Sequence, residues 1–300
     1  MRTYHAPSAL HLLRWQLKNF AIFMSLSIAV VVAEQLTGSV AGVLPDVPVT
    51  VLGSAIGIYV SFRTNSAYDR WWEGRKLWGQ LVNSSRHFCA QTVAYLPAES
   101  LRSACRELVL HQILYVHALR CELRGEPVDQ DADVARMAGE CSERIDVSQP
   151  ALTARLLRGQ LRDVASLAAD GSLDARKLQS FDTTLATLLD VQGGCERIRN
   201  TPLPPMYARI SELLIRTYAV LLPLAIVDDL RWLAIPVSIV VCLAFKLISE
   251  VGRILEDPFT RGRDALPLHA LSRTIERNLR DAIGDTQPPP AEPDNDGVLL

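Results

Sequence analysis

The chain has 300 residues, of which 49% are hydrophobic, and a formal net charge of −2. Its mean hydropathy of +0.13 is high for a soluble globular protein but low for a transporter built entirely of membrane helices. We therefore expect a part in the membrane joined to a polar helical domain. The balanced charge provides no basic field for nucleic acid, so no nucleic-acid partner is expected.

Four apolar runs carry the membrane prediction: Asn19–Ala33, Val47–Phe62, Thr217–Val227 and Trp232–Phe245. Each is shorter than the ~18–20 apolar residues of a typical spanning helix, so buried helices of a soluble protein are the alternative. Long charged side chains at their ends can extend a span by reaching the interface. Short linkers pair the runs into two hairpins, which predicts four membrane helices with both termini and the middle domain on one side.

Loop charge indicates which side this is. The charged residues in the linkers Gln35–Asp46 and Asp228–Arg231 are three aspartates and one arginine, whereas the opposite ends of the runs are flanked by arginines and lysines. The positive-inside rule then places both termini and the middle domain in the cytoplasm.

The second run has two stripes at helical spacing. Gly53, Gly57 and Ser61 share one face, and small residues at this spacing allow close helix packing in a bilayer. The adjacent stripe is Ser54, Ile58 and Phe62. Periodicity alone favours the alternative that Ile58 and Phe62 are ordinary core residues of a four-helix unit.

An Arg- and Trp-rich segment, Arg63–Gly79, follows this run. Its most distinctive side chains are Arg70, Trp71, Trp72, Glu73 and Trp78. A belt at the membrane interface is one interpretation, because tryptophan favours the headgroup level. A structural cation–π cluster below the membrane is the other.

The middle of the chain shows helical patterns at about 101–120, 151–168 and 173–199. Turn residues separate them at 125–127 and 170–171, and prolines at 202, 204 and 205 end the stretch. The proline-rich, acidic segment 287–300 is predicted to be a disordered tail.

Signatures of catalysis and metal binding are missing from the sequence. We find no phosphate-binding loop, no HExxH and no GxSxG. The six cysteines form no CxxC pair, and His111 and His117 lie six residues apart, on different faces of a helix. We therefore expect no enzyme activity, no cofactor and no metal site.

Three blocks resemble one known family. They are Phe62-Arg63 with Asp69-Arg70-Trp71-Trp72-Glu73 and Arg75-Lys76-Leu77-Trp78-Gly79; Gly193-Gly194-Cys195-Glu196-Arg197-Ile198 with Thr201-Pro202-Leu203-Pro204; and Glu256-Asp257-Pro258-Phe259. With the four apolar runs in order, the chain over about residues 10–270 resembles the bestrophins, specifically their bacterial relatives.

This resemblance implies an all-α membrane protein: a homopentamer around one axial pore, with four transmembrane helices per subunit and a helical cytosolic domain. The second membrane helix would line the pore, with a neck at Ser54, Ile58 and Phe62. The family neck is usually apolar at all three levels, and Ser54 departs from this. A second constriction is expected at Leu178, with Leu173 behind it.

The implied function is a channel for small monovalent ions in a bacterial inner (plasma) membrane, in contact with lipid and other copies of itself. The family resemblance implies that anions such as chloride are the permeant ions. A sodium-preferring channel of the same fold and a non-conducting membrane scaffold are the alternatives. The stretch Thr260-Arg261-Gly262-Arg263-Asp264-Ala265 replaces the acidic calcium clasp of animal members and cannot supply an oxygen-rich calcium shell.

The expected organisation has six parts. They are an N-terminal cytosolic segment (1–18), a first transmembrane hairpin with the pore helix (19–63), a cytosolic helical domain (64–210), a second transmembrane hairpin (211–250), a cytosolic C-terminal helical segment (251–286) and the tail (287–300).

Overall fold

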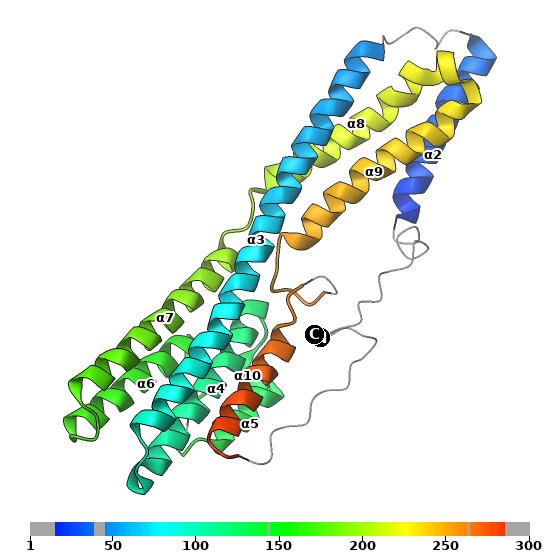
Figure 1. The fold of residues 1–300 in the computed structure, drawn as a ribbon. Helices are drawn as coiled ribbons and strands as arrows, with labels where there is room; N and C mark the ends of the chain where they lie inside the picture. Colours follow the sequence, from blue (N-terminus) through cyan, green and yellow to red (C-terminus); the bar gives the residue numbers. More distant parts are fainter. Residues whose placement is uncertain (1–15, 39–45, 143–144, 263–264, 286–300) are drawn as a thin grey trace. The chain divides into compact units, whose positions relative to one another are not determined.

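The computed structural model describes residues 16–38, 46–142, 145–262 and 265–285, and every regular element in these ranges is helical (Figure 1). The α-helices are α2 (Leu17–Thr37), α3 (Asp46–Tyr95), α4 (Arg102–Arg124), α5 (Ala132–Glu140), α6 (Leu152–Ala169), α7 (Ala175–Asn200), α8 (Pro205–Leu230), α9 (Ala234–Leu255) and α10 (Leu268–Ala282). Short 3₁₀ turns are η1 (Glu99–Leu101), η2 (Val128–Gln130) and η3 (Arg231–Leu233). The predicted tail, 287–300, and most of the predicted N-terminal segment lie outside the described residues.

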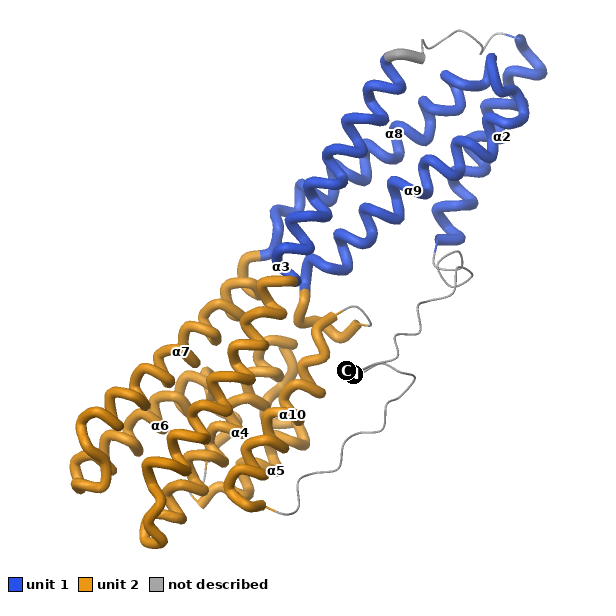
Figure 2. Tube along the Cα trace, in the orientation of Figure 1, with its two compact units in different colours: residues 1–71, 202–257 blue, residues 72–201, 258–300 orange. Residues whose placement is uncertain are grey.

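The chain divides into two compact units (Figure 2). Unit 1 comprises residues 1–71 and 202–257, and unit 2 comprises residues 72–201 and 258–300. Both predicted hairpins, 19–63 and 211–250, fall within unit 1. Helix α3 contributes to both units, with the boundary after Trp71.

Unit 1 is a bundle of α2, α8, α9 and the first part of α3. Helix α2 packs against both α8 and α9, which also pack against each other. Buried side chains from all four helices form its core, among them Phe23, Ile56, Tyr218 and Ile239.

Large apolar side chains cover much of the outside of unit 1. Examples are Leu213, Val240 and Trp232, each more than half exposed. Among the exposed large hydrophobics in the described part of the chain, only Trp72, Val93, Leu161 and Leu189 belong to unit 2. A soluble bundle normally turns such residues inward, so this surface is suited to lipid or protein contact.

Two stretches are long and apolar enough, by length and composition alone, to cross a membrane: Leu17–Thr37 and Pro205–Leu255, which contains α8 and α9. Helix α3 is not one of them, and its charge-free part ends at Arg63. The count of four spans therefore stays a prediction.

Unit 2 is a helical bundle built around α4, which contacts α5, α6, α7 and α10. Every residue of α4 from Leu108 to Cys121 is buried. The periodicity at 101–120 correctly predicts a helix, but it indicates a helix with one buried face. The difference arises because neighbouring helices enclose α4 on all sides, so its polar residues are buried as well.

The other two helices predicted in this region are confirmed. Helix α6 (152–169) and helix α7 (175–200) match the patterns at 151–168 and 173–199 to within two residues. Between them, Gly171 adopts a left-handed backbone conformation with φ 78°. Glycine takes this conformation without steric cost, which explains the turn residues predicted at 170–171.

Candidate pore-lining site

The stripe of Ser54, Ile58 and Phe62 lies on an exposed face of α3 in unit 1. Ile58 and Phe62 are 60% and 67% exposed, although both are large and apolar. The Ser54 hydroxyl donates a 3.1 Å hydrogen bond to the carbonyl of Thr50 in its own helix. The stripe is therefore left open by the rest of its own chain.

Gly53 and Gly57 lie on the packed side of α3. A Cβ atom at Gly53 would be 2.6 Å from the Tyr218 hydroxyl of α8, and one at Gly57 would be 3.6 Å from the ring of Phe245 in α9. Ser61, the third residue of that predicted face, is exposed. Within one chain the small-residue contact thus involves the two glycines, and a packing role for Ser61 stays a prediction.

Arg63 anchors α3 to α9 just beyond the stripe. Its side chain is 4% exposed and donates to the Ser249 hydroxyl at 3.1 Å and to the Glu256 carboxylate at 3.5 Å. One residue on, the Thr64 hydroxyl donates to the carbonyl of Ile248 at 3.2 Å. Because these bonds fix the rotation of α3 about its axis, they also fix which face stays exposed.

Sequence reasoning did not identify Arg63 as an anchor. The ion pair joins residues 193 positions apart, beyond the reach of any local pattern. The only available signal was that Arg63 and Glu256 both fall in blocks that carry the family resemblance.

The five Arg/Trp-segment residues occupy different surroundings. In unit 1, Arg70 donates from Nε to the Glu256 carbonyl at 3.1 Å, and Trp71 stacks on Tyr68 with ring centroids 6.4 Å apart. In unit 2, Glu73 forms an ion pair with Arg197, Trp78 is completely buried and Trp72 is 46% exposed. Trp78 is therefore a core residue of its unit, whereas Trp72 is partly exposed.

The two residues proposed for a second constriction also differ. Leu173 is only 4% exposed and is enclosed by its own chain. Leu178 lies in the first turns of α7 and is half-buried. Of the two, Leu178 has the accessibility that a constriction requires, and its role stays a prediction.

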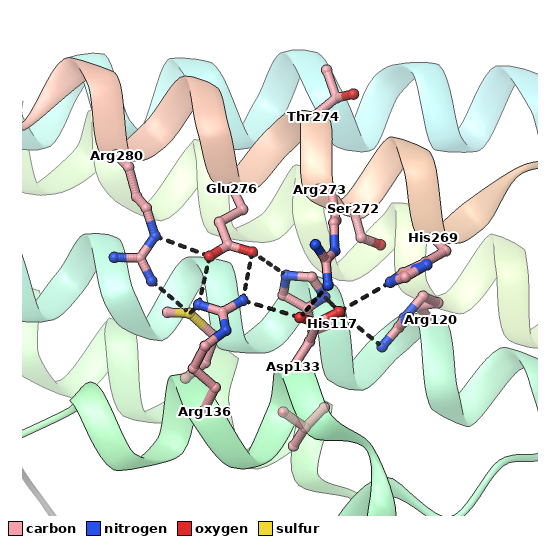
Figure 3. Close-up of polar contacts among 12 residues, drawn as sticks. His117, Arg120, Asp133, Arg136, His269, Ser272, Arg273, Thr274, Glu276 and Arg280 are labelled. Atoms are coloured by element: carbon pink, nitrogen blue, oxygen red, sulfur yellow. Dashed lines mark hydrogen bonds and ion pairs between the residues drawn. The ribbon is translucent and has the colours of Figure 1, made fainter. Parts of the chain in front are cut away.

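A second concentration of functional groups is an ion-pair network inside unit 2 (Figure 3). Its centre is Glu276 of α10, whose side chain is completely buried. The carboxylate accepts hydrogen bonds from His117 of α4 at 2.9 Å, from Arg136 of α5 at 2.8 and 3.0 Å, and from Arg280 at 2.9 Å.

Asp133 of α5 is the second centre of this network (Figure 3). It accepts from Arg136 at 3.1 Å, from Arg273 at 3.0 Å and from His269 at 3.0 Å. The network thereby ties α10 to both α4 and α5.

Both carboxyl groups remain charged because of these cations. Burial opposes the charge of Glu276, but the hydrogen bonds from His117 and Arg136 outweigh burial and hold its pKa well below the usual range. Burial likewise opposes the charge of Asp133, but His117, Arg136 and Arg273 lower its pKa. Carboxylates saturated in this way act as structural clamps, since they have little capacity left to take up protons.

Unit 1 has an apolar outer surface and unit 2 is an internally clamped helical bundle, a combination typical of an all-α membrane protein with a polar helical domain. The bacterial/fungal bestrophin family model matches residues 11–281, and the chain belongs to this family.

Named relatives and a solved structure agree with this assignment. The chain is 35% identical to a voltage-dependent anion channel-forming protein of Ralstonia nicotianae, over 81% of this chain and 78% of the relative. It is 32% identical to the protein of that name from Escherichia coli strain K12, over 77% and 75% of the two chains. The crystal structure of a bacterial bestrophin homologue from Klebsiella pneumoniae superimposes with a TM-score of 0.82 and 29% identity, covering 90% of this chain and 99% of that one.

Replacing Glu276 by Gln tests the clamp. We expect Glu276→Gln to lower the free energy of unfolding of unit 2 by about 3–5 kcal/mol, because the surrounding cations lose their buried partner. Thermal unfolding of the purified protein, followed by circular dichroism, measures the change. Glu99→Gln is the control, because the Glu99–Arg102 pair is largely exposed.

The same residue predicts a pH dependence. Its folded pKa is depressed below the ordinary value of 4.5, so its stabilising contribution is present above about pH 4.5 and is lost as the pH falls towards the folded value. Wild-type protein should therefore lose more stability than Glu276→Gln between pH 5 and about pH 3. Parallel melting curves for the two proteins would refute the clamp.

Proposed function

We propose that this chain is the subunit of a bestrophin-type ion channel in a bacterial inner membrane, with five α3 helices lining one axial pore. The observation that carries the proposal is the exposed stripe of Ser54, Ile58 and Phe62. Unit 2 and both termini lie in the cytoplasm, following the loop charges. Small anions such as chloride are the permeant ions, which is supported by relatives named as anion channel-forming proteins.

The composition of the exposed face of α3 favours a pore over a lipid contact. Along this face Ile58 and Phe62 are followed by Asn65, Ser66 and Asp69, all exposed. Polar and charged side chains are costly in hydrocarbon and are normally turned towards protein or a water-filled path. In contrast, the exposed residues of α2, such as Ile28 and Val32, fit contact with lipid.

Five copies of the stripe would form a neck with three levels. Rings of Ile58 and Phe62 present no polar group to an ion that has lost its hydration water, so a narrow neck of this kind closes by dewetting and conducts when it widens. The Ser54 ring at the outer level is smaller and better hydrated. Leu178 would form a separate narrow point in the cytosolic part.

The uncharged neck does not itself choose between anions and cations, so a sodium-preferring channel is the alternative of the same fold. A non-conducting membrane scaffold is the alternative of a different class. Catalysis has no support in the described network, since its carboxylates are engaged by arginines and histidines.

One set of measurements separates these possibilities. Oligomer mass in detergent, ion flux in liposomes and the reversal potential in a chloride gradient should give five subunits, flux and anion preference. A reversal potential of opposite sign would select the cation channel, and a flux equal to empty liposomes would select the scaffold.

Shortening the neck side chains tests the pore assignment. We expect Ile58→Ala and Phe62→Ala to raise single-channel conductance or open probability, because a smaller apolar ring widens and hydrates more readily. Recordings in planar bilayers provide the measurement. Val240→Ala is a matched control, since Val240 is 66% exposed on α9 but does not belong to the stripe. Currents unchanged in both neck variants would remove the neck from these positions.

Calcium should not activate this channel through the segment after α9. Among residues 260–265, Arg261 donates from Nε to the Glu126 carboxylate at 2.6 Å, and residues 263 and 264 lie outside the described ranges. One carboxylate beside two arginines cannot supply the six to eight oxygen ligands typical of calcium. Open probability in bilayers should be the same with and without micromolar calcium, and a rise would contradict this prediction.

A further inference from the structure

Buried polar residues of α4 mostly hydrogen-bond to the surrounding helices, but several of their nitrogens, His111 Nε2 among them, have no hydrogen-bond partner. Gln112 donates to Ser85 at 2.9 Å, and His117 pairs with Glu276. His111 is 7% exposed, yet its Nε2 atom makes no hydrogen bond. This nitrogen lies within ion-pair distance of Glu107. A buried nitrogen without a hydrogen bond is costly, which raises the question of what else it binds.

The surroundings of His111 consist of metal-ligand types. Glu107 lies one turn earlier on α4, with Oε1 3.3 Å from His111 Nε2 but outside hydrogen-bond geometry. Cys141 follows the end of α5. One potential ligand atom from each of Glu107, His111 and Cys141 lies within 4.8 Å of the other two.

Two neighbours orient these groups. The backbone N–H and the hydroxyl of Ser142 donate to the two oxygens of Glu107 at 2.8 and 2.9 Å. On the other side of the ring, Asp163 of α6 lies 3.7 Å from His111 Nδ1. A carboxylate behind the imidazole is the usual support of a metal-binding histidine.

The pocket favours positive charge. Carboxylate oxygens of Glu107 and Asp163 lie 3.3 and 3.7 Å from the two ring nitrogens of His111. The negative charge of these two carboxylates would stabilise a bound cation beside the ring.

We propose that Glu107, His111 and Cys141 bind one zinc ion, through a carboxylate oxygen, the Nε2 nitrogen and the thiolate sulfur. A mixed set of thiolate, imidazole and carboxylate ligands suits zinc rather than magnesium or calcium. Binding releases the proton of the Cys141 thiol and any proton on His111 to solvent. The ion joins α4 to the segment after α5, and Asp163 orients the histidine from α6. This site is independent of the proposed channel function.

The other cluster of similar composition, Cys121 with Glu126 and Asp131, does not qualify. Asp131 accepts a 2.6 Å hydrogen bond from Arg120, and Glu126 accepts one of 2.6 Å from Arg261. These carboxylates are already paired with cations, whereas Nε2 of His111 has no hydrogen-bond partner.

Zinc titration of the full-length protein tests the proposal. Protein purified in detergent and stripped with a chelator is titrated with zinc against a fluorescent zinc indicator. We expect one zinc ion per chain in the wild type, and loss of this site in Cys141→Ser and Glu107→Gln. Asp163→Asn should weaken affinity about 10–100-fold, as expected for a supporting carboxylate.

Cys105→Ser is the matched control, because Cys105 lies on α4 and is not one of the three ligands. Thermal unfolding without zinc checks that each variant folds. Cobalt substitution in the wild type gives a second readout, since a cobalt–thiolate bond adds an ultraviolet charge-transfer band. Zinc binding unchanged in Cys141→Ser, or wild-type protein without this band, would overturn the proposal.

Discussion

The close approach of α3 to α9 is the contact on which the candidate pore depends. Gly252 lies against Thr64, and a Cβ atom at position 252 would be 3.3 Å from the Thr64 Cα and 3.0 Å from its hydroxyl. The buried Arg63 anchors α3 beside this contact. Once these atoms are in place, Ile56 and Val60 must face the core of unit 1, and Ile58 and Phe62 must face outward. The exposed stripe is thus a consequence of packing on the opposite face.

Unit 2 differs from unit 1 because it contains a network of buried ion pairs and hydrogen bonds. Its central helix carries histidine, glutamine and arginine side chains through a fully buried stretch, which is costly unless folding supplies them with partners. The network around Glu276 and Asp133 meets this need with charged groups from α5 and α10. Such a network contributes less net stability than an apolar core would, but misplacing any one helix leaves a buried charge unpaired. This penalty makes the arrangement of α4, α5 and α10 specific.

Local patterns predicted the helices well because helix formation depends on neighbouring residues. The 3.6-residue period located α6 and α7, and it separated Ser54, Ile58 and Phe62 from Gly53 and Gly57. Periodicity could not assign the stripe to a pore, since that requires knowledge of several subunits. The proposed pore role rests on the family resemblance.

Contacts between distant residues were out of reach of the sequence. In the sequence, His111 could be considered as a ligand only together with its near neighbour His117. In the structure, packing of α5 against α4 brings Cys141, thirty positions away, to His111. The pairing of Arg63 with Glu256 is of the same kind. Both depend on how helices pack, which no pattern within one helix encodes.

The buried state of Arg63 has a consequence for ion selectivity. In the proposed pentamer, an arginine directly after the neck could be taken for a ring of five positive charges that attracts anions into the pore. In this protein the guanidinium is turned into the helix bundle and is neutralised by Glu256, at 3.5 Å. A charge paired in this way contributes little to the electrostatic potential along the axis. In the proposed channel, discrimination between chloride and sodium would therefore arise from other groups along the conduction path.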